Sequence, residues 1–138
     1  MKPAAMNDTQ QFDQEVDLLV IGSGNGALTT ALCAKLMGSK SVLVIEKGDV
    51  IGGTSSMSGG GIWIPNSRYA KALKVDDSPE DAKTYLQATI PADVFREDMI
   101  DAYLENGPKM LDFLHQNSLV KYISLAHYPD YYSDVPGA

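Results

Sequence analysis

The sequence predicts an α/β fold built on a parallel sheet. Two apolar runs, VDLLVI (16–21) and SVLVIEKG (41–48), are separated by a glycine-rich turn and a stretch with helical spacing. Nearly continuous apolar runs are typical of parallel strands that are covered on both faces. The order strand, helix, strand therefore predicts a β-α-β unit.

Each further element follows from a local signal. Residues 1–15 are polar and predict a flexible lead. A helix is expected over 27–37, since alanines recur on one face and Gly38 supplies a C-terminal stop. Residues 49–67 hold five of the 12 glycines and are expected to form a loop.

The second half of the chain predicts helices. Ser78 is the expected N-cap of a helix over 79–89, because a proline and two acids follow it. A second helix is expected over about 94–105 and a third that restarts at Gly107-Pro108. Residues 119–125 are a candidate strand, and an aromatic, turn-rich tail follows.

Composition excludes some classes of protein. The 138 residues are 44% hydrophobic, which is enough for a globular core, and the formal net charge is −7. With no basic stripe, we expect no nucleic-acid partner. We assign no metal ligands. The lone Cys33 and the lack of an apolar run of about 20 residues favour a cytoplasmic protein, with peripheral membrane contact left open.

The turn GSGNGA carries a dinucleotide-binding pattern. Gly22 turns the chain sharply, Gly24 lets backbone amides approach a pyrophosphate, and Ala27 lets the helix pack closely on the strand. The helix N-terminus adds a positive dipole. This predicts an incomplete Rossmann-like domain of the GxGxxA type with a helical extension, since two strands do not complete the sheet and missing or partner segments must do so.

Glu46, at the end of the second apolar run, restricts the choice of dinucleotide. A carboxylate there accepts hydrogen bonds from ribose hydroxyls and repels a 2′-phosphate, which favours FAD or NAD over NADP. The second glycine loop, GGTSSMSGGG (52–61), would extend the row of backbone amides and favours FAD. A plain surface loop remains the alternative for these residues.

Three segments carry a family resemblance: DLLVIGSGNGALTTAL (17–32), VLVIEKGDVIGGTSSMSGGGIWIPN (42–66) and YPDYYSDVPG (128–137). They resemble the N-terminus of the fumarate reductase and succinate dehydrogenase flavoprotein superfamily, and within it the 3-ketosteroid Δ1-dehydrogenases. The resemblance implies that residues 16–138 are the N-terminal part of an FAD-binding domain, with 120–138 approaching the substrate cavity.

The resemblance also implies the cofactor site. The relatives with covalent FAD place a histidine in the second loop, where this chain has Thr54, Ser55 and Ser56, so we expect non-covalent FAD. Glu46 and Lys47 would contact the adenosine. The residues implied along the pyrophosphate and flavin are Gly22, Ser23, Gly24, Asn25, Gly26, Ala27, Gly53, Thr54, Ser55, Ser58, Gly59 and Gly60.

Tyr131 is the implied catalytic residue. The family reaction removes a proton from C2 of a 3-ketosteroid and passes a hydride from C1 to the flavin, giving a C1–C2 double bond. Tyr131 would support a second tyrosine that these residues do not contain, so a second polypeptide or a missing C-terminal part would carry the catalytic domain. The alternative is that the tyrosines of HYPDYY only pack a loop against the core.

Two other functions stay open at this stage. One is a fumarate-reductase-like flavoprotein that reduces another activated alkene, although Arg68 and Arg96 form no recognisable dicarboxylate clamp. The other is a non-catalytic subunit that binds FAD or NAD. The sequence favours the steroid dehydrogenase, with a steroid-like small molecule as substrate.

Overall fold

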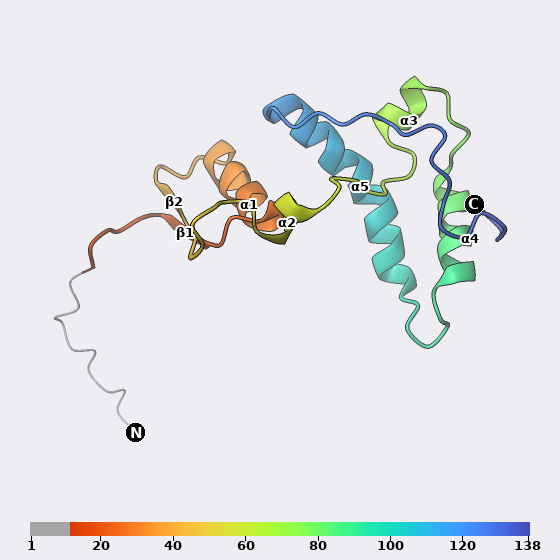
Figure 1. Cartoon of the computed structure of the whole chain (residues 1–138), viewed down its shortest axis with the longest axis horizontal. Helices are drawn as coiled ribbons and strands as arrows, with labels where there is room; N and C mark the ends of the chain where they lie inside the picture. The colour runs from red at the N-terminus through yellow and green to blue at the C-terminus, as the bar shows by residue number, and fades with distance from the viewer. Residues whose placement is uncertain (1–11) are drawn as a thin grey trace. The chain divides into compact units, whose positions relative to one another are not determined.

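The computed structural model describes residues 12–138 (Figure 1). These residues fall into two compact units, a first that ends at Gly61 and a second that spans Ile62–Ala138. Residues 1–11, most of the expected flexible lead, lie outside the described residues. The division into a lead of residues 1–15 and a domain portion of residues 16–138 stays a prediction.

The first unit is built on a parallel β-α-β arrangement. Strand β1 (Leu18–Ile21) pairs in parallel with β2 (Val42–Ile45) in a two-stranded sheet. Helix α1 (Asn25–Leu36) connects the strands and packs against both of them. The predicted α/β class is therefore confirmed, although both strands are shorter than the apolar runs that predicted them.

Hydrogen bonds fix the starts of the two strands and the end of α1. The Asp17 carboxylate accepts from the backbone amides of Lys40, at 2.7 Å, and Ser41, at 2.9 Å, which ties the start of β1 to the start of β2. At the end of α1, Gly38 has a φ of +104°, and the Ser39 amide donates to the Ala34 carbonyl at 3.0 Å. This is the glycine stop expected from the sequence.

The sheet leaves apolar side chains in solvent. Val20 is the apolar residue of β1 that is buried, whereas Ile21 is 78% exposed and Leu19 and Ile45 are also exposed. Side chains two positions apart on a strand share a face of the sheet, and Ile45 pairs with Ile21, so the exposed residues Leu19, Ile21 and Ile45 leave one face of this sheet open. This agrees with the expectation that further segments complete it.

The glycine-rich stretch 49–67 contains a short helix, α2 (Gly53–Met57), so the prediction of a continuous loop is wrong for these five residues. Gly52 makes the helix possible. Its φ of +114° turns the chain, and its carbonyl accepts the first helical hydrogen bond, from the Ser56 amide at 3.2 Å.

The second unit is helical. Helix α3 spans Arg68–Ala72, α4 spans Pro79–Thr89 and α5 spans Glu97–Asn117. The bounds of α4 are those predicted, and the Ser78 hydroxyl accepts from the Asp81 amide at 3.0 Å as its N-cap. Helices α4 and α5 pack together, and the buried apolar side chains of this unit are Ala70, Ala82, Tyr85, Leu104, Leu111 and Leu114.

Two predictions for this unit are wrong. Gly107 and Pro108 lie inside the single helix α5 and do not separate two helices, because the buried face of Leu104, Gly107 and Leu111 continues through them and packing outweighs the proline penalty of about 3 kcal/mol. Residues 119–125 form no strand. Within the second unit no strand is present to pair with them, and Leu119 is 98% exposed.

None of the described helices combines the length and apolar character needed to cross a membrane. Among the same residues, no group of three or more histidine, cysteine and acidic side chains could hold a metal ion.

Candidate functional site

The first glycine loop joins β1 to α1. Gly22 has a φ of +94°, a conformation that favours glycine, and its amide donates to the Ile45 carbonyl at 2.7 Å. Gly24 is the N-cap of α1, so the helix begins at Asn25 and not at Ala27 as the sequence predicted. The loop therefore presents the N-terminus of α1 beside the carboxyl end of β1.

At two positions of this loop, neither the backbone conformation nor the surrounding atoms require a glycine. Gly24 has an ordinary φ of −70°, and a side-chain carbon there would lie 3.6 Å from the Ser55 hydroxyl, an ordinary contact. Gly26, in the first turn of α1, would place such a carbon in open space, with nothing within 4 Å. Because neither turn geometry nor packing explains them, these glycines leave a bare helix N-terminus that fits the close approach of a phosphate group.

Ser23 links the first loop to Glu46 and to the second loop. Its side chain is 1% exposed, and its hydroxyl donates to Glu46 Oε2 at 2.5 Å and accepts from the Gly52 amide at 2.9 Å. The other carboxylate oxygen, Oε1, accepts from the Gly48 amide at 3.0 Å. These bonds, first that of Ser23 and then that of Gly48, lower the pKa of Glu46 and keep it ionised.

The second glycine loop touches the first at close range. The Asn25 amide donates to the Ser55 hydroxyl at 3.1 Å. A side-chain carbon at Gly53 would lie 3.6 Å from the Cα of Gly24, an ordinary contact, so the two loops lie side by side. The next amides of the first turn, those of Gly26 and Ala27, have no acceptor within α1 and are suited to bind an anion.

The structure gathers only part of the predicted cofactor set. Hydrogen bonds join Ser23 to Glu46 and Asn25 to Ser55. Gly24 lies between Ser23 and Asn25 in the chain and beside the Ser55 hydroxyl. The exposed residues of the set are Asn25, Gly26, Lys47, Gly53, Thr54, Ser58, Gly59 and Gly60. Sequence reasoning missed Gly52, whose amide completes the bonds of Ser23, although the pair Gly52-Gly53 was a visible signal.

Tyr131 lies in the second unit and is 92% exposed. Its neighbours Tyr128 and Tyr132 are also exposed. The alternative in which these tyrosines pack a loop against the core is therefore not what the structure shows. The catalytic role of Tyr131 stays a prediction.

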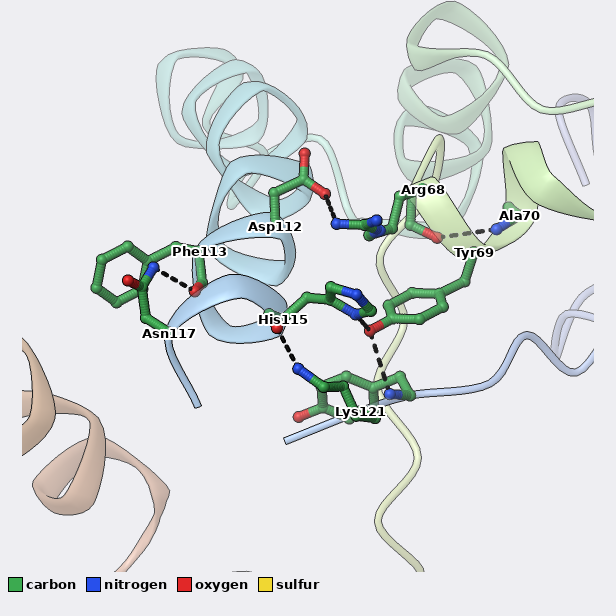
Figure 2. Close-up of polar contacts among 10 residues, drawn as sticks. Arg68, Tyr69, Ala70, Asp112, Phe113, His115, Asn117 and Lys121 are labelled. Atoms are coloured by element: carbon green, nitrogen blue, oxygen red, sulfur yellow. Dashed lines mark hydrogen bonds and ion pairs between the residues drawn. The ribbon is translucent and has the colours of Figure 1, made fainter. Parts of the chain in front are cut away.

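A separate polar cluster fixes the start of the tail (Figure 2). His115 Nδ1 lies 2.8 Å from the Tyr69 hydroxyl, which also accepts from the Tyr122 amide at 3.3 Å. Burial, together with the charges of Arg68 and Lys121, lowers the pKa of His115. A neutral ring can accept a hydrogen bond from the Tyr69 hydroxyl at Nδ1, so His115 joins α5 to Tyr69 and has a structural role.

The first unit is a parallel β-α-β unit with a glycine turn, a bare helix N-terminus and a carboxylate after the second strand. This combination is typical of a dinucleotide-binding α/β protein. The family model described as "FAD binding domain" matches residues 17–130. The chain belongs to this family, and its cofactor is FAD.

Three known proteins show the range of the relatives. The 3-oxosteroid 1-dehydrogenase of Mycolicibacterium smegmatis is 43% identical over 90% of this chain and 21% of its own length. The 4-oxocyclohexanecarboxylate 2-dehydrogenase of Sinomonas cyclohexanicum is 41% identical over 88% of this chain and 21% of its own length.

The third is a solved structure, that of 3-ketosteroid-Δ4-(5α)-dehydrogenase from Rhodococcus jostii RHA1 in complex with 4-androstene-3,17-dione. It is 29% identical, has a TM-score of 0.68, and is matched over 79% of this chain and 22% of its own. The chain thus spans about a fifth of the length of the relatives that it matches. The predicted resemblance to the flavin-dependent ketosteroid dehydrogenases is confirmed.

Proposed function

We propose that this chain is the FAD-binding portion of a flavin-dependent dehydrogenase of 3-ketosteroids that introduces a C1–C2 double bond. The observation that carries the proposal is the joining of both glycine loops and Glu46 through the buried hydroxyl of Ser23. The similarity to 3-oxosteroid 1-dehydrogenases supports the choice of substrate.

The residues proposed to hold FAD follow the loops. The first loop and the start of α1, residues 22–27, would bind the pyrophosphate through backbone amides. Glu46 would accept hydrogen bonds from the ribose, since a carboxylate has about four acceptor positions and two are in use. Lys47 would contact the adenosine, and residues 53–60 would line the pyrophosphate and flavin. Non-covalent attachment stays part of the proposal.

The chemistry needs both a hydride acceptor and a base. FAD supplies the hydride acceptor when it is bound. Tyr131 would donate a hydrogen bond to a second tyrosine that acts as the base, which lowers the energy of the charged form of that base. The base would come from the part of the enzyme that lies beyond this chain, on the same or a second polypeptide. We further propose a cytoplasmic enzyme that can meet a membrane surface to take up apolar substrate.

A second candidate substrate is a smaller cyclic ketone. The relative from Sinomonas cyclohexanicum is named for a 4-oxocyclohexanecarboxylate and is nearly as similar to this chain as the steroid enzyme. Both names share a ring ketone. The residues described here are proposed to hold the cofactor and not the substrate, so the choice between the two substrates depends on a direct comparison.

The test is product analysis with the complete enzyme that contains this chain. The enzyme is incubated with a 3-keto-4-ene steroid or with 4-oxocyclohexanecarboxylate and an artificial electron acceptor, and the products are identified by mass spectrometry. We expect a steroid product that lacks one hydrogen from C1 and one from C2. Turnover of the carboxylate alone would favour the second candidate, and turnover of neither would refute both.

Tyr131→Phe is the matched variant for this test. It removes one hydroxyl from an exposed side chain, so the fold and the flavin content should not change. Loss of a hydrogen bond to a charged group should lower turnover about 10- to 100-fold. Unchanged turnover would refute the role of Tyr131 and leave the FAD assignment intact.

A further inference from the structure

We propose that Trp63 and Asp130 form a positioning pair that holds Tyr131 in place for the reaction. The inference rests on the proposed function, because Tyr131 must act at the substrate for its position to matter. It concerns two residues to which neither the sequence pattern nor the similarity assigns a role. Both residues lie in the second unit.

Contacts with two helices fix the position of the Trp63 ring. It stacks on Tyr103 of α5, with ring centroids 6.4 Å apart and planes at 8°, and meets the buried ring of Tyr85 of α4 at 5.8 Å. The Tyr103 hydroxyl also donates to the carbonyl of Trp63. Burial raises the pKa of Tyr103, which keeps that hydroxyl protonated and able to donate. Two helices therefore hold Trp63 in one orientation.

The Trp63 ring also contacts the C-terminal tail. Trp63 Nε1 donates to Asp130 Oδ1 at 3.1 Å, across 67 positions of sequence. The indole nitrogen can only donate, and a carboxylate can only accept, so the pair has one possible polarity. Asp130 is half-buried, and the next residue in the chain is Tyr131.

A second anchor of the tail lies beyond Tyr131, at Gly137. Gly137 has a φ of +83°, and a side-chain carbon there would lie 2.3 Å from the Asp81 carbonyl oxygen and 2.6 Å from the Tyr85 amide. The backbone of the tail therefore lies directly on α4, as Figure 1 shows at the C-terminus. The tail is held before Tyr131 by Asp130 and after it by Gly137.

Between these anchors the phenol of Tyr131 stands in solvent. Among residues 12–138 no hydrogen bond or ring contact of this side chain sets its place, so the backbone must do so. A misplacement of about 1 Å in a catalytic constellation can lower the rate about 100-fold. The Trp63–Asp130 bond, next to Tyr131, is the contact best placed to prevent such a displacement.

The test compares substitutions that separate the bond from the packing. Asp130→Leu removes the acceptor and keeps the size of the side chain, whereas Asp130→Asn keeps an oxygen that can accept from the indole. Trp63→Phe removes the donor and keeps an aromatic ring for the Tyr103 stack. Each is made in the complete enzyme, in the wild-type and in the Tyr131→Phe background, and kcat, KM and bound FAD are measured.

If the pair acts through Tyr131, its loss should have an effect only when the phenol hydroxyl is present. We expect Asp130→Leu and Trp63→Phe to lower kcat about 10-fold in the wild-type background and less than about twofold with Tyr131→Phe. Asp130→Asn should restore kcat to within about threefold, and the FAD content should be the same throughout.

A readout that does not depend on turnover checks the contact itself. With 15N-labelled tryptophan, the indole N–H resonance of Trp63 is identified as the one that disappears in Trp63→Phe. It should move to higher field in Asp130→Leu, where the hydrogen bond is lost, and stay near its wild-type position in Asp130→Asn.

The outcomes separate failure of this inference from failure of the proposed function. A normal Tyr131→Phe enzyme refutes the role of Tyr131 and with it the positioning pair. A Tyr131→Phe enzyme that is impaired, together with equal losses from Asp130→Leu in both backgrounds, refutes the pair alone, because additive losses indicate a purely structural role. An indole resonance that does not respond to Asp130→Leu also refutes it.

Discussion

Gly26→Ala should weaken FAD binding without weakening the fold. An alanine side chain at this position meets no atom within 4 Å and lies in the first turn of α1. Since alanine favours a helix over glycine by at most about 1 kcal/mol, the stability of the cofactor-free protein should stay the same or rise. The added methyl group covers the amides proposed to bind the pyrophosphate.

The size of the binding loss follows from the hydrogen bonds at stake. A hydrogen bond to a charged group contributes about 1.5–3 kcal/mol, so displacing one such bond should raise the Kd for FAD about 10- to 100-fold. The assay is titration of the cofactor-free complete enzyme with FAD, followed by flavin fluorescence, beside a thermal denaturation curve recorded without FAD.

Gly38→Ala is the control at the opposite end of the same helix. Gly38 has a φ of +104° and equally open surroundings, so alanine there is strained by its backbone alone, at about 1–2 kcal/mol. It should lower the melting temperature and leave the Kd for FAD unchanged. Normal FAD binding by Gly26→Ala, or equal losses of stability and affinity in the two variants, would show that Gly26 is not required for the pyrophosphate.

Three further predictions concern the hydrogen bonds described above. Ser23→Ala leaves the Gly52 amide without its acceptor in a buried place, so thermal or urea denaturation should show a loss of about 1–3 kcal/mol. Thr84→Ala, at an exposed position of α4, should change stability by less than about 0.5 kcal/mol. The pKa of Glu46 lies below its ordinary value of 4.5 in the fold, so its stabilisation is complete above pH 4.5 and is lost as the pH falls through the lower folded pKa. Denaturation curves of Glu46→Gln should therefore depend less on pH in that range, and equal slopes would contradict this. Within the cluster of Figure 2 the pKa of His115 is lowered from 6.5, so stability should fall as the pH drops from 6.5 to the lower folded pKa. His115→Gln should remove that dependence.

The sequence predicted the elements whose signals are local. The glycine turn, the parallel strands and the helix that begins after Ser78 each follow from residues close together in the chain, and all three are confirmed. The predicted break at Gly107-Pro108 is wrong for the opposite reason. A local helix breaker is overridden by burial against distant residues, such as Ile64, whose side chain lies 3.2 Å from the place of a Gly107 side-chain carbon.

The candidate site shows the same limit. Sequence spacing indicated the glycines and Glu46, because their pattern belongs to one β-α-β unit. It gave no sign that the buried hydroxyl of Ser23 would join Glu46 to Gly52, or that Trp63 would bond to Asp130. Those contacts depend on loops that meet only when the chain folds, and no local pattern marks them.

We propose above that this chain places FAD in an enzyme that oxidises a 3-ketosteroid. The most direct measurement is anaerobic addition of a 3-keto-4-ene steroid to the complete, FAD-loaded enzyme while the visible absorption of the flavin is recorded. We predict that the band of the oxidised flavin is lost and returns when an electron acceptor is added. An absorption band that persists with the steroid, in enzyme whose flavin dithionite still bleaches, would contradict the claim.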